Sequence, residues 1–233
     1  MTTLVNYQLK DSIATITLDD GKANALSLRM QSEINAALDR AAADKALVVL
    51  TGRPGMFSAG FDLAVLSAGG SDAHKMLIGG FQLAERLLSF PKPVVLACSG
   101  HAIAMGVFLV LSADYRIGAE GAFKIIANEV AIGLTMPWSA VEICRQRLAP
   151  AHFNRVVMNS ELYSPGDAVA AGFLDRVVPA ADLLNEALGA AAKLAKLNMP
   201  AHAATKLRAR EQTLQALRAA IEADDAVFRT MFR

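Results

Sequence analysis

The loop from Thr51 to Leu63 has the residue types to bind an anion with its backbone. It follows an apolar, strand-like run, Ala46 to Leu50, and its small residues carry little side-chain bulk before Phe61. Asp62 has the residue type that caps a helix, which leaves the N–H of Phe61 free near a helix start. A free amide there can stabilise an oxyanion, although an ordinary strand-to-helix turn would have the same pattern.

A second loop of the same form occurs further along the chain. A short apolar strand, Val94-Val95-Leu96-Ala97, is followed by Ser99-Gly100 and then by Ala104-Met105-Gly106 at the start of a helix-like run. Two loops of this kind can supply two oxyanion donors to one pocket. Ser58 and Ser99 lack a paired base, so we assign them to turn geometry rather than to nucleophilic attack.

The composition is that of a globular protein. The 233 residues suit one sizeable domain or one domain with an appendage. Apolar residues make up 54% and 23 Lys and Arg balance 22 Asp and Glu, which argues against disorder and against nucleic acid as a partner. The Ala-rich, apolar composition also indicates faces buried between subunits, so we expect an oligomer.

The sequence indicates a soluble, cytoplasmic protein with no membrane partner. Cys98 and Cys144 lie in apolar runs, as buried thiols in a reducing compartment do. The first ten residues lack the pattern of a signal peptide, no apolar run is long enough to span a bilayer, and Thr230 to Arg233 is no peroxisomal ending of the Ser-Lys-Leu kind. The four histidines lack the spacing of metal ligands, so we expect no metal.

Strands alternate with helices along the chain, which indicates an α/β architecture. Alternation predicts a strand over Ile13–Leu18, and Ser27 predicts the cap of a helix. The buried stripe of that helix is expected at Met30, Ile34, Ala37, Leu38 and Ala41. Four strand-then-helix units follow, with helices expected over 73–90 and 181–197, among others. We expect a core over residues 1–197 and a C-terminal helical packing region over residues 198–233.

Five motifs in the same order resemble those of the crotonase family, the enoyl-CoA hydratase/isomerase superfamily. The two loops described above are the first two. The others are Gly21-Lys22-Ala23-Asn24-Ala25-Leu26, Ala113-Asp114-Tyr115-Arg116, and Ser164 to Ala168 together with Gly172 to Val178. The resemblance extends over nearly the whole chain. It implies an acyl-CoA enzyme of the kind used in fatty acid metabolism, built as a spiral of ββα units with a C-terminal helical trimerisation region.

The resemblance also implies where the substrate binds. The thioester carbonyl would lie between the N–H groups of Phe61 and Met105. Coenzyme A, which is part of the substrate and not a separate cofactor, would lie along the residues Lys22, Ala23, Leu26, Ala59, Gly60, Phe61, Asp62 and Leu63. Lys22 is a candidate phosphate partner, and an exposed lysine beside two aspartates is the alternative. The oligomer would be a homotrimer, or a hexamer made of two trimers.

The choice of reaction depends on two further positions. Hydratases of the family use two glutamates, and the position of the first falls here at Phe108, which cannot titrate. The second is matched by Glu129, in a segment from Asn128 to Trp138 that resembles Δ3,Δ2-enoyl-CoA isomerases, which also carry an apolar residue where Phe108 lies. The resemblance therefore implies an isomerase with Glu129 as the proton shuttle.

The chemistry agrees with that substitution. Adding water to a 2-enoyl thioester is naturally divided between two carboxylates, whereas moving a double bond needs one carboxylate and the exclusion of water. We expect Val130, Ile132 and Leu134 to raise the pKa of Glu129 by desolvation.

Departures from the family pattern leave other functions open. Ala104 and Met105 stand where the family commonly has glycines, which puts the second donor in doubt. A hydratase or another crotonase reaction would need a second acid, for which Glu120 and Glu142 are the candidates. A catalytically silent acyl-CoA-binding protein is the alternative outside enzymes.

Overall fold

A β-hairpin opens the fold. β1 (Val5–Lys10) pairs antiparallel with β2 (Ile13–Leu18), which confirms the first predicted strand. Asp11 and Ser12, between the strands, both have positive φ, the backbone conformation of a tight two-residue hairpin turn. The computed structural model describes residues 3–231, so residues 1–2 and 232–233 of the predicted regions lie outside it.

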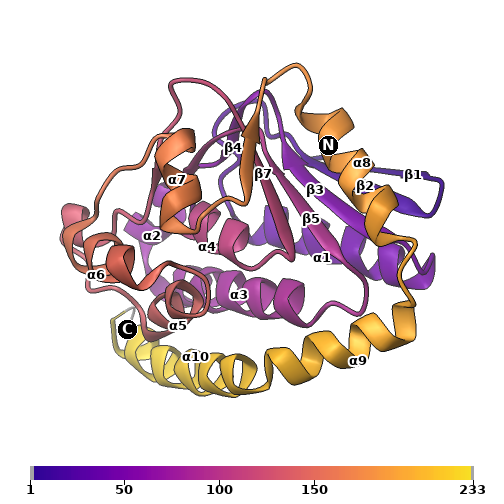
Figure 1. Cartoon of the computed structure of the whole chain (residues 1–233). Helices are drawn as coiled ribbons and strands as arrows, with labels where there is room; N and C mark the ends of the chain where they lie inside the picture. The colour runs from indigo at the N-terminus through magenta and orange to yellow at the C-terminus, as the bar shows by residue number, and fades with distance from the viewer. Residues whose placement is uncertain (1–2, 232–233) are drawn as a thin grey trace.

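The larger sheet is parallel beyond that hairpin. Its order is β1-β2-β3-β5-β7-β9, with β3 (Leu47–Gly52), β5 (Val94–Cys98), β7 (Tyr115–Ala119) and β9 (Arg176–Val178). Every residue of β3 and β5 is buried, because helices cover this sheet on both sides (Figure 1).

A smaller parallel sheet follows the ends of these strands. It consists of β4 (Gly55–Ser58), β6 (Gly100–Ile103) and β8 (Ile125–Ile126). β3, β5 and β7 each lead into one strand of the small sheet, so the chain repeats a long strand, a short strand and a connection. This repetition is the predicted spiral.

The helices start and end close to their predicted positions. In the first half of the chain they are α1 (Leu28–Ala43), α2 (Leu63–Ala68), α3 (Gly70–Ser89) and α4 (Met105–Leu111). In the second half they are the 3-10 turn η1 (Val130–Ile132), α5 (Trp138–Arg145), α6 (Pro150–Asn159), α7 (Pro165–Ala171) and α8 (Leu183–Leu194). The Ser27 side chain accepts from the Met30 N–H at 3.2 Å, and the predicted stripe of α1 is buried, so both predictions are confirmed.

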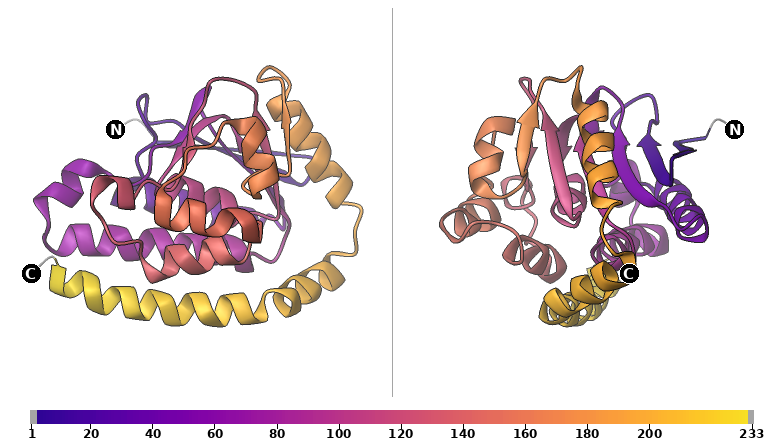
Figure 2. Two further views of the ribbon diagram at one scale, coloured as in Figure 1. Left: turned by 60° about the vertical axis from the view of Figure 1, so that its left-hand side comes forward. Right: turned by 45° about the vertical axis from the view of Figure 1, so that its right-hand side comes forward.

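The C-terminal region is a pair of helices, α9 (Met199–Ala209) and α10 (Glu211–Met231), that runs along one side of the core (Figures 1 and 2). α10 packs on α3 and α5 of its own chain through an apolar stripe that includes Leu217 and Phe228. In α9, by contrast, the buried residue is Lys206. No helix in residues 3–231 is long and apolar enough to cross a membrane.

Candidate active site

The register of the small sheet brings three loops together. Ser58 of β4 pairs with Ala102 of β6, and Ala102 pairs with Ile125 of β8. Phe61 and Met105 therefore stand at equivalent positions, each three residues beyond its paired strand residue. Glu129 lies one residue past the corresponding position after β8. Because the strands are parallel, all three residues leave the sheet at its carboxyl edge.

The first loop is held in place by Asn24. Its buried side-chain amide donates to the carbonyl oxygens of Leu18, Met56 and Phe57, at 2.9, 3.1 and 3.1 Å. The Ser58 hydroxyl donates to the Asn24 carbonyl oxygen at 2.8 Å, which confirms its assignment to turn geometry. This role of Asn24 was not predicted beyond its place in a motif, since a side chain that binds three carbonyls has no local sequence signal.

The two loops touch at glycines. Gly60 has φ of +91°, and a Cβ added there would lie 2.9 Å from Ala104 Cβ and 3.3 Å from the Met105 nitrogen. Only a glycine permits both this backbone conformation and this approach. The contact fixes the segment before Phe61 against the start of α4.

Both proposed donors have free N–H groups. Within residues 3–231, neither the Phe61 N–H nor the Met105 N–H has a hydrogen-bond acceptor. The Asp62 side chain caps α2 through Ala64 and Val65, as the sequence predicts. Ala104 has φ of 49° and ψ of −124°, a conformation that suits glycine, so α4 begins at Met105 despite the missing glycines, with strain at Ala104.

An aromatic row joins the first donor to the position of the missing acid. The Phe61 ring packs edge-on against Phe81 of α3, with centroids 6.2 Å apart, and Phe81 packs against Phe108 at the same distance. Gly80 makes room for Phe61, because a Cβ there would lie 2.5 Å from its ring. Phe108 is fully buried and forms part of an apolar wall.

Glu129 is a buried carboxylate without a counter-charge. It is 8% exposed, and its Oε2 has no hydrogen-bond partner among the described residues. Burial raises its pKa to about 7, and a hydrogen bond with its own backbone N–H offsets part of that rise. Burial and the Glu129 charge both raise the pKa of the Cys144 thiol, which places the carboxylate near α5. A carboxyl group with this pKa is suited to act as a base near neutral pH.

The apolar residues expected to surround Glu129 are themselves partly exposed. Val130, Ile132 and Leu134 are 43%, 55% and 44% exposed, while burial is the main cause of the raised Glu129 pKa, as the sequence predicts. They lie in η1 and just after it. The sequence pattern indicated an apolar neighbourhood but could not show which way the side chains point.

Glu120 and Glu142, the candidates for a second acid, are not buried in the way that Glu129 is. Glu142 forms an ion pair with Arg145 at 3.2 Å, and Glu120 is exposed at the end of β7. The other buried acid of the described chain, Asp224 of α10, accepts from the backbone N–H groups of Trp138 and Ser139 and from the Ser139 hydroxyl. Asp224 therefore anchors the start of α5, and Glu129 is the buried acid with a free oxygen.

The residues predicted to contact coenzyme A lie around the first loop but are not equally accessible. Lys22 is exposed and its carbonyl accepts from Arg53 Nε at 2.9 Å, while Leu63 is 69% exposed. Leu26 is fully buried, and its N–H donates to the Gly60 carbonyl at 2.8 Å. Leu26 thus holds the loop and offers no side-chain surface to a ligand.

The histidines lie apart from one another. His74 pairs with Asp225, His152 contacts the Tyr163 hydroxyl, and His101 binds the Lys124 N–H. No group of three or more His, Cys, Asp or Glu suited to a metal ion occurs in the described part of the chain. Cys98 and Cys144 are buried free thiols, as expected.

The spiral of long and short strands, with two free amides and a buried carboxylate at one sheet edge, defines a crotonase-fold acyl-CoA enzyme. Residues 8–233 match the family model described as enoyl-CoA hydratase/isomerase, and the chain belongs to this family.

Solved structures agree with this assignment. A family protein from Pseudomonas syringae is 49% identical, with TM-score 0.94, over 96% of this chain and 97% of that one. A Mycobacterium tuberculosis protein, named an enoyl-CoA isomerase in one solved structure and a probable enoyl-CoA hydratase in another, is 48% identical over 97% of this chain and 99% and 96% of those chains, with TM-scores of 0.93 and 0.94. The human mitochondrial enoyl-CoA delta isomerase 1 is 30% identical over 95% of this chain and 75% of its own length.

Proposed function

We propose that the protein is a Δ3,Δ2-enoyl-CoA isomerase, with Glu129 moving one proton along the acyl chain. The observation that carries the proposal is a buried carboxylate with a free oxygen, at the same sheet edge as two free amides. The substrate is a 3-enoyl thioester of coenzyme A, and its coenzyme A portion lies along the loop that begins after β4.

In this proposal the Phe61 and Met105 N–H groups donate to the thioester oxygen. Glu129 removes a proton from C2, and the electron pair moves through the double bond system to give a dienolate. The two donors stabilise the negative oxygen, each by about 3 kcal/mol. Glu129 then returns the proton to C4, which forms the 2-enoyl thioester and restores the carboxylate.

Two features favour isomerisation over hydration. Hydration needs a positioned water and a second proton-transfer group, and buried Phe108 occupies the position where the family's hydratases carry their first glutamate. The apolar wall formed by Phe61, Phe81 and Phe108 also helps to exclude water, which protects a dienolate from other reactions.

Relatives with hydratase and carnitinyl-CoA dehydratase names make hydration the alternative. To separate the two, the purified protein is given a 3-enoyl-CoA and, separately, a 2-enoyl-CoA. We expect conversion of the first to the conjugated 2-enoyl thioester, followed by absorbance, and no water adduct of the second by mass spectrometry. Hydration of the second substrate without isomerisation of the first would refute the proposal. Binding of both without turnover would indicate a silent acyl-CoA-binding protein.

We also propose that the active form is a homotrimer or a pair of trimers. Supporting this, Val130, Ile132, Leu134 and Trp138 leave apolar surface exposed on one segment of the isolated chain. Sedimentation velocity at micromolar concentration tests the proposal, which a monomeric active enzyme would contradict.

A further inference from the structure

A second candidate site, partly lined by charged side chains, lies away from the active site, beside α9. A cavity of about 520 Å³ is bordered by α9, by the residue before β7 and by the turn after α5. Its charged lining residues are Asp114, Arg147, Lys206 and Arg210, and His202 also lines it. Asp114 precedes β7 and binds the N–H of Val94 at the start of β5. The cavity therefore lies at the amino ends of strands whose carboxyl ends lead to the active-site loops.

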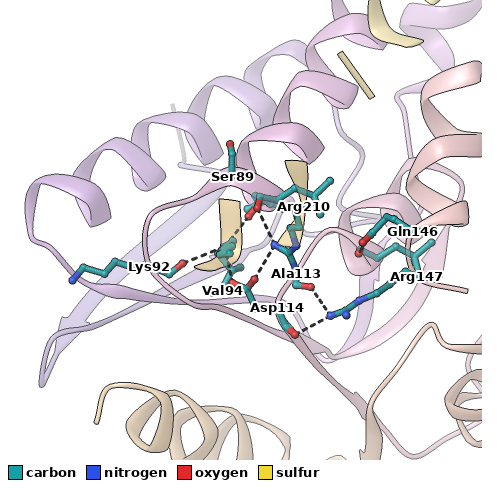
Figure 3. A network of polar contacts seen from close by, with 12 residues as sticks. Ser89, Lys92, Val94, Ala113, Asp114, Gln146, Arg147 and Arg210 are labelled. Carbon is teal, nitrogen blue, oxygen red and sulfur yellow. Dashed lines mark hydrogen bonds and ion pairs between the residues drawn. The ribbon is translucent and has the colours of Figure 1, made fainter. Parts of the chain in front are cut away.

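The single carboxylate of this lining is already fully engaged. Asp114 Oδ2 accepts from Lys206 Nζ at 2.8 Å and from the Val94 N–H at 2.7 Å, and its Oδ1 pairs with Arg210 Nη1 at 2.8 Å. Figure 3 shows Arg210 and Arg147 approaching Asp114 and its neighbour Ala113 from different sides. The lining contains three cationic side chains and one carboxylate, so it carries an excess of positive charge.

Two lining groups have unused polar atoms. Arg147 Nη2 donates to the carbonyl oxygens of Ala113 and Asp114, at 3.1 and 2.8 Å, but its buried Nε has no partner among residues 3–231. The buried Nδ1 of His202 is likewise unpaired within the described chain. Unpaired buried polar atoms are unfavourable unless something else satisfies them.

The electrostatics agree with this geometry. Burial, and then the charge of Arg116, lower the pKa of Arg147 to about 10; Arg210 acts in the same direction, while Asp175 and Asp114 act in the opposite one. Burial also lowers the pKa of His202; Lys206, Arg210 and Lys92 lower it further, while Asp114 raises it. Both groups thus lie in a positive field that an anion would neutralise.

We propose that this cavity binds a phosphate group, either inorganic phosphate or the phosphate of a small monoester. The guanidinium of Arg147 supplies the planar donor geometry that suits phosphate oxygens. A phosphate dianion also matches the excess of positive charge better than a carboxylate does. Binding there would tie α9, whose buried residue is Lys206, to the core.

Isothermal titration calorimetry with inorganic phosphate, at constant ionic strength set by chloride, tests the proposal. We expect saturable binding to the unmodified protein and at least a tenfold weaker affinity in Arg147→Met. The matched control is Arg145→Met, because Arg145 lies in the same segment but is 57% exposed and pairs with Glu142. Absent binding to the unmodified protein, or equal affinity in Arg147→Met, overturns the proposal.

A second measurement needs no variant. Saturating phosphate should raise the pKa of the His202 ring, followed by NMR, because the anion offsets the nearby positive charges. An unchanged His202 pKa overturns the proposal. A parallel titration with glycerol phosphate separates the two sources: tighter binding of the monoester assigns the site to a phosphorylated metabolite, and tighter binding of inorganic phosphate assigns it to the free ion.

Discussion

Glu129 and Asp114 are carboxylates shielded from solvent in the same chain, and their surroundings are opposite. Glu129 is 8% exposed, and among residues 3–231 it has no ion-pair partner and one oxygen without a hydrogen bond. The Asp114 side chain is 14% exposed, and its two oxygens bind Lys206, Arg210 and a backbone N–H. Burial without a partner makes a carboxylate a stronger base, whereas burial with partners makes it part of the structure.

The difference shows how one fold keeps a catalytic carboxylate apart from a carboxylate that attaches a helix to the core. The Glu129 carboxylate lies at the carboxyl edge of the small sheet, where a reacting group must stay unpaired to accept a proton. The Asp114 carboxylate lies at the opposite end of the strands, where it binds Lys206 of α9, and Lys206 also donates to the Leu87 carbonyl oxygen near the end of α3. Substituting each residue should therefore have effects of different kinds, and in stability of opposite sign.

The largest expected effect is on catalysis. Glu129→Gln keeps the shape but removes the base, so kcat/KM for a 3-enoyl-CoA should fall by between about 100-fold and 10,000-fold. Steady-state absorbance assays measure this, and acyl-CoA affinity should change little. Glu142→Gln is the matched control, since Glu142 is paired with Arg145, and it should retain full activity. An equal fall in kcat/KM in both variants would show that Glu129 is not the specific catalytic base.

The next effect is on stability. Asp114→Asn leaves the Lys206 ammonium, whose side chain is 4% exposed, without its counter-charge, and should lower the free energy of unfolding by about 3–5 kcal/mol. Urea denaturation measures this. Asp39→Asn removes the partner of Arg86 at a side chain 74% exposed and should cost less than about 1 kcal/mol. Similar losses for the two variants would show that burial of the Asp114 pair contributes nothing.

Urea denaturation of Glu129→Gln should show a higher free energy of unfolding than that of the unmodified protein. The carboxyl has a pKa of about 7 in the folded chain against 4.5 as its ordinary value. As the pH rises through this window, the unfolded chain releases its proton before the folded chain does, so the native protein loses stability, by roughly 3 kcal/mol in all. Glu129→Gln avoids that loss.

The gain should therefore depend on pH. Glu129→Gln should be more stable than the unmodified protein at about pH 8.5 and nearly equally stable at about pH 4, where Glu129 is mostly protonated in both states. Urea denaturation at both pH values checks this. A gain of the same size at both would mean that charge burial is not its cause.

The smallest expected effect lies in the backbone just before the second donor, Met105. Ala104→Gly should relieve the strain of φ 49° and raise the free energy of unfolding by roughly 1 kcal/mol, while leaving both carboxylates as they are. Thermal unfolding measures this. Gly60→Ala is the opposing control, because its Cβ would meet Ala104, and it should lower both stability and activity. A destabilised Ala104→Gly would show that Ala104 is unstrained.

The elements were predictable because their signals are local. The Ser27 and Asp62 caps, the α1 stripe and the apolar strands follow from residue types a few positions apart, and the structure confirms them. The Asn24 contacts were not predictable, since they join carbonyls of segments more than 30 residues apart. The exposure of Val130, Ile132 and Leu134 was missed for a related reason: an apolar residue type does not specify its direction in an irregular segment.

By itself, the sequence determined that this chain forms alternating strands and helices of the crotonase type, with Glu129 present and Phe108 where a second acid would be. Local hydrogen bonding, hydrophobic periodicity and motif order are sufficient for that. Only the tertiary structure decided that Glu129 is buried with one oxygen unpaired among the described residues, while Asp114 forms ion pairs with Lys206 and Arg210. The physical reason is that the pKa and the role of a carboxylate depend on its neighbours in space, and folding brings those neighbours from distant parts of the chain.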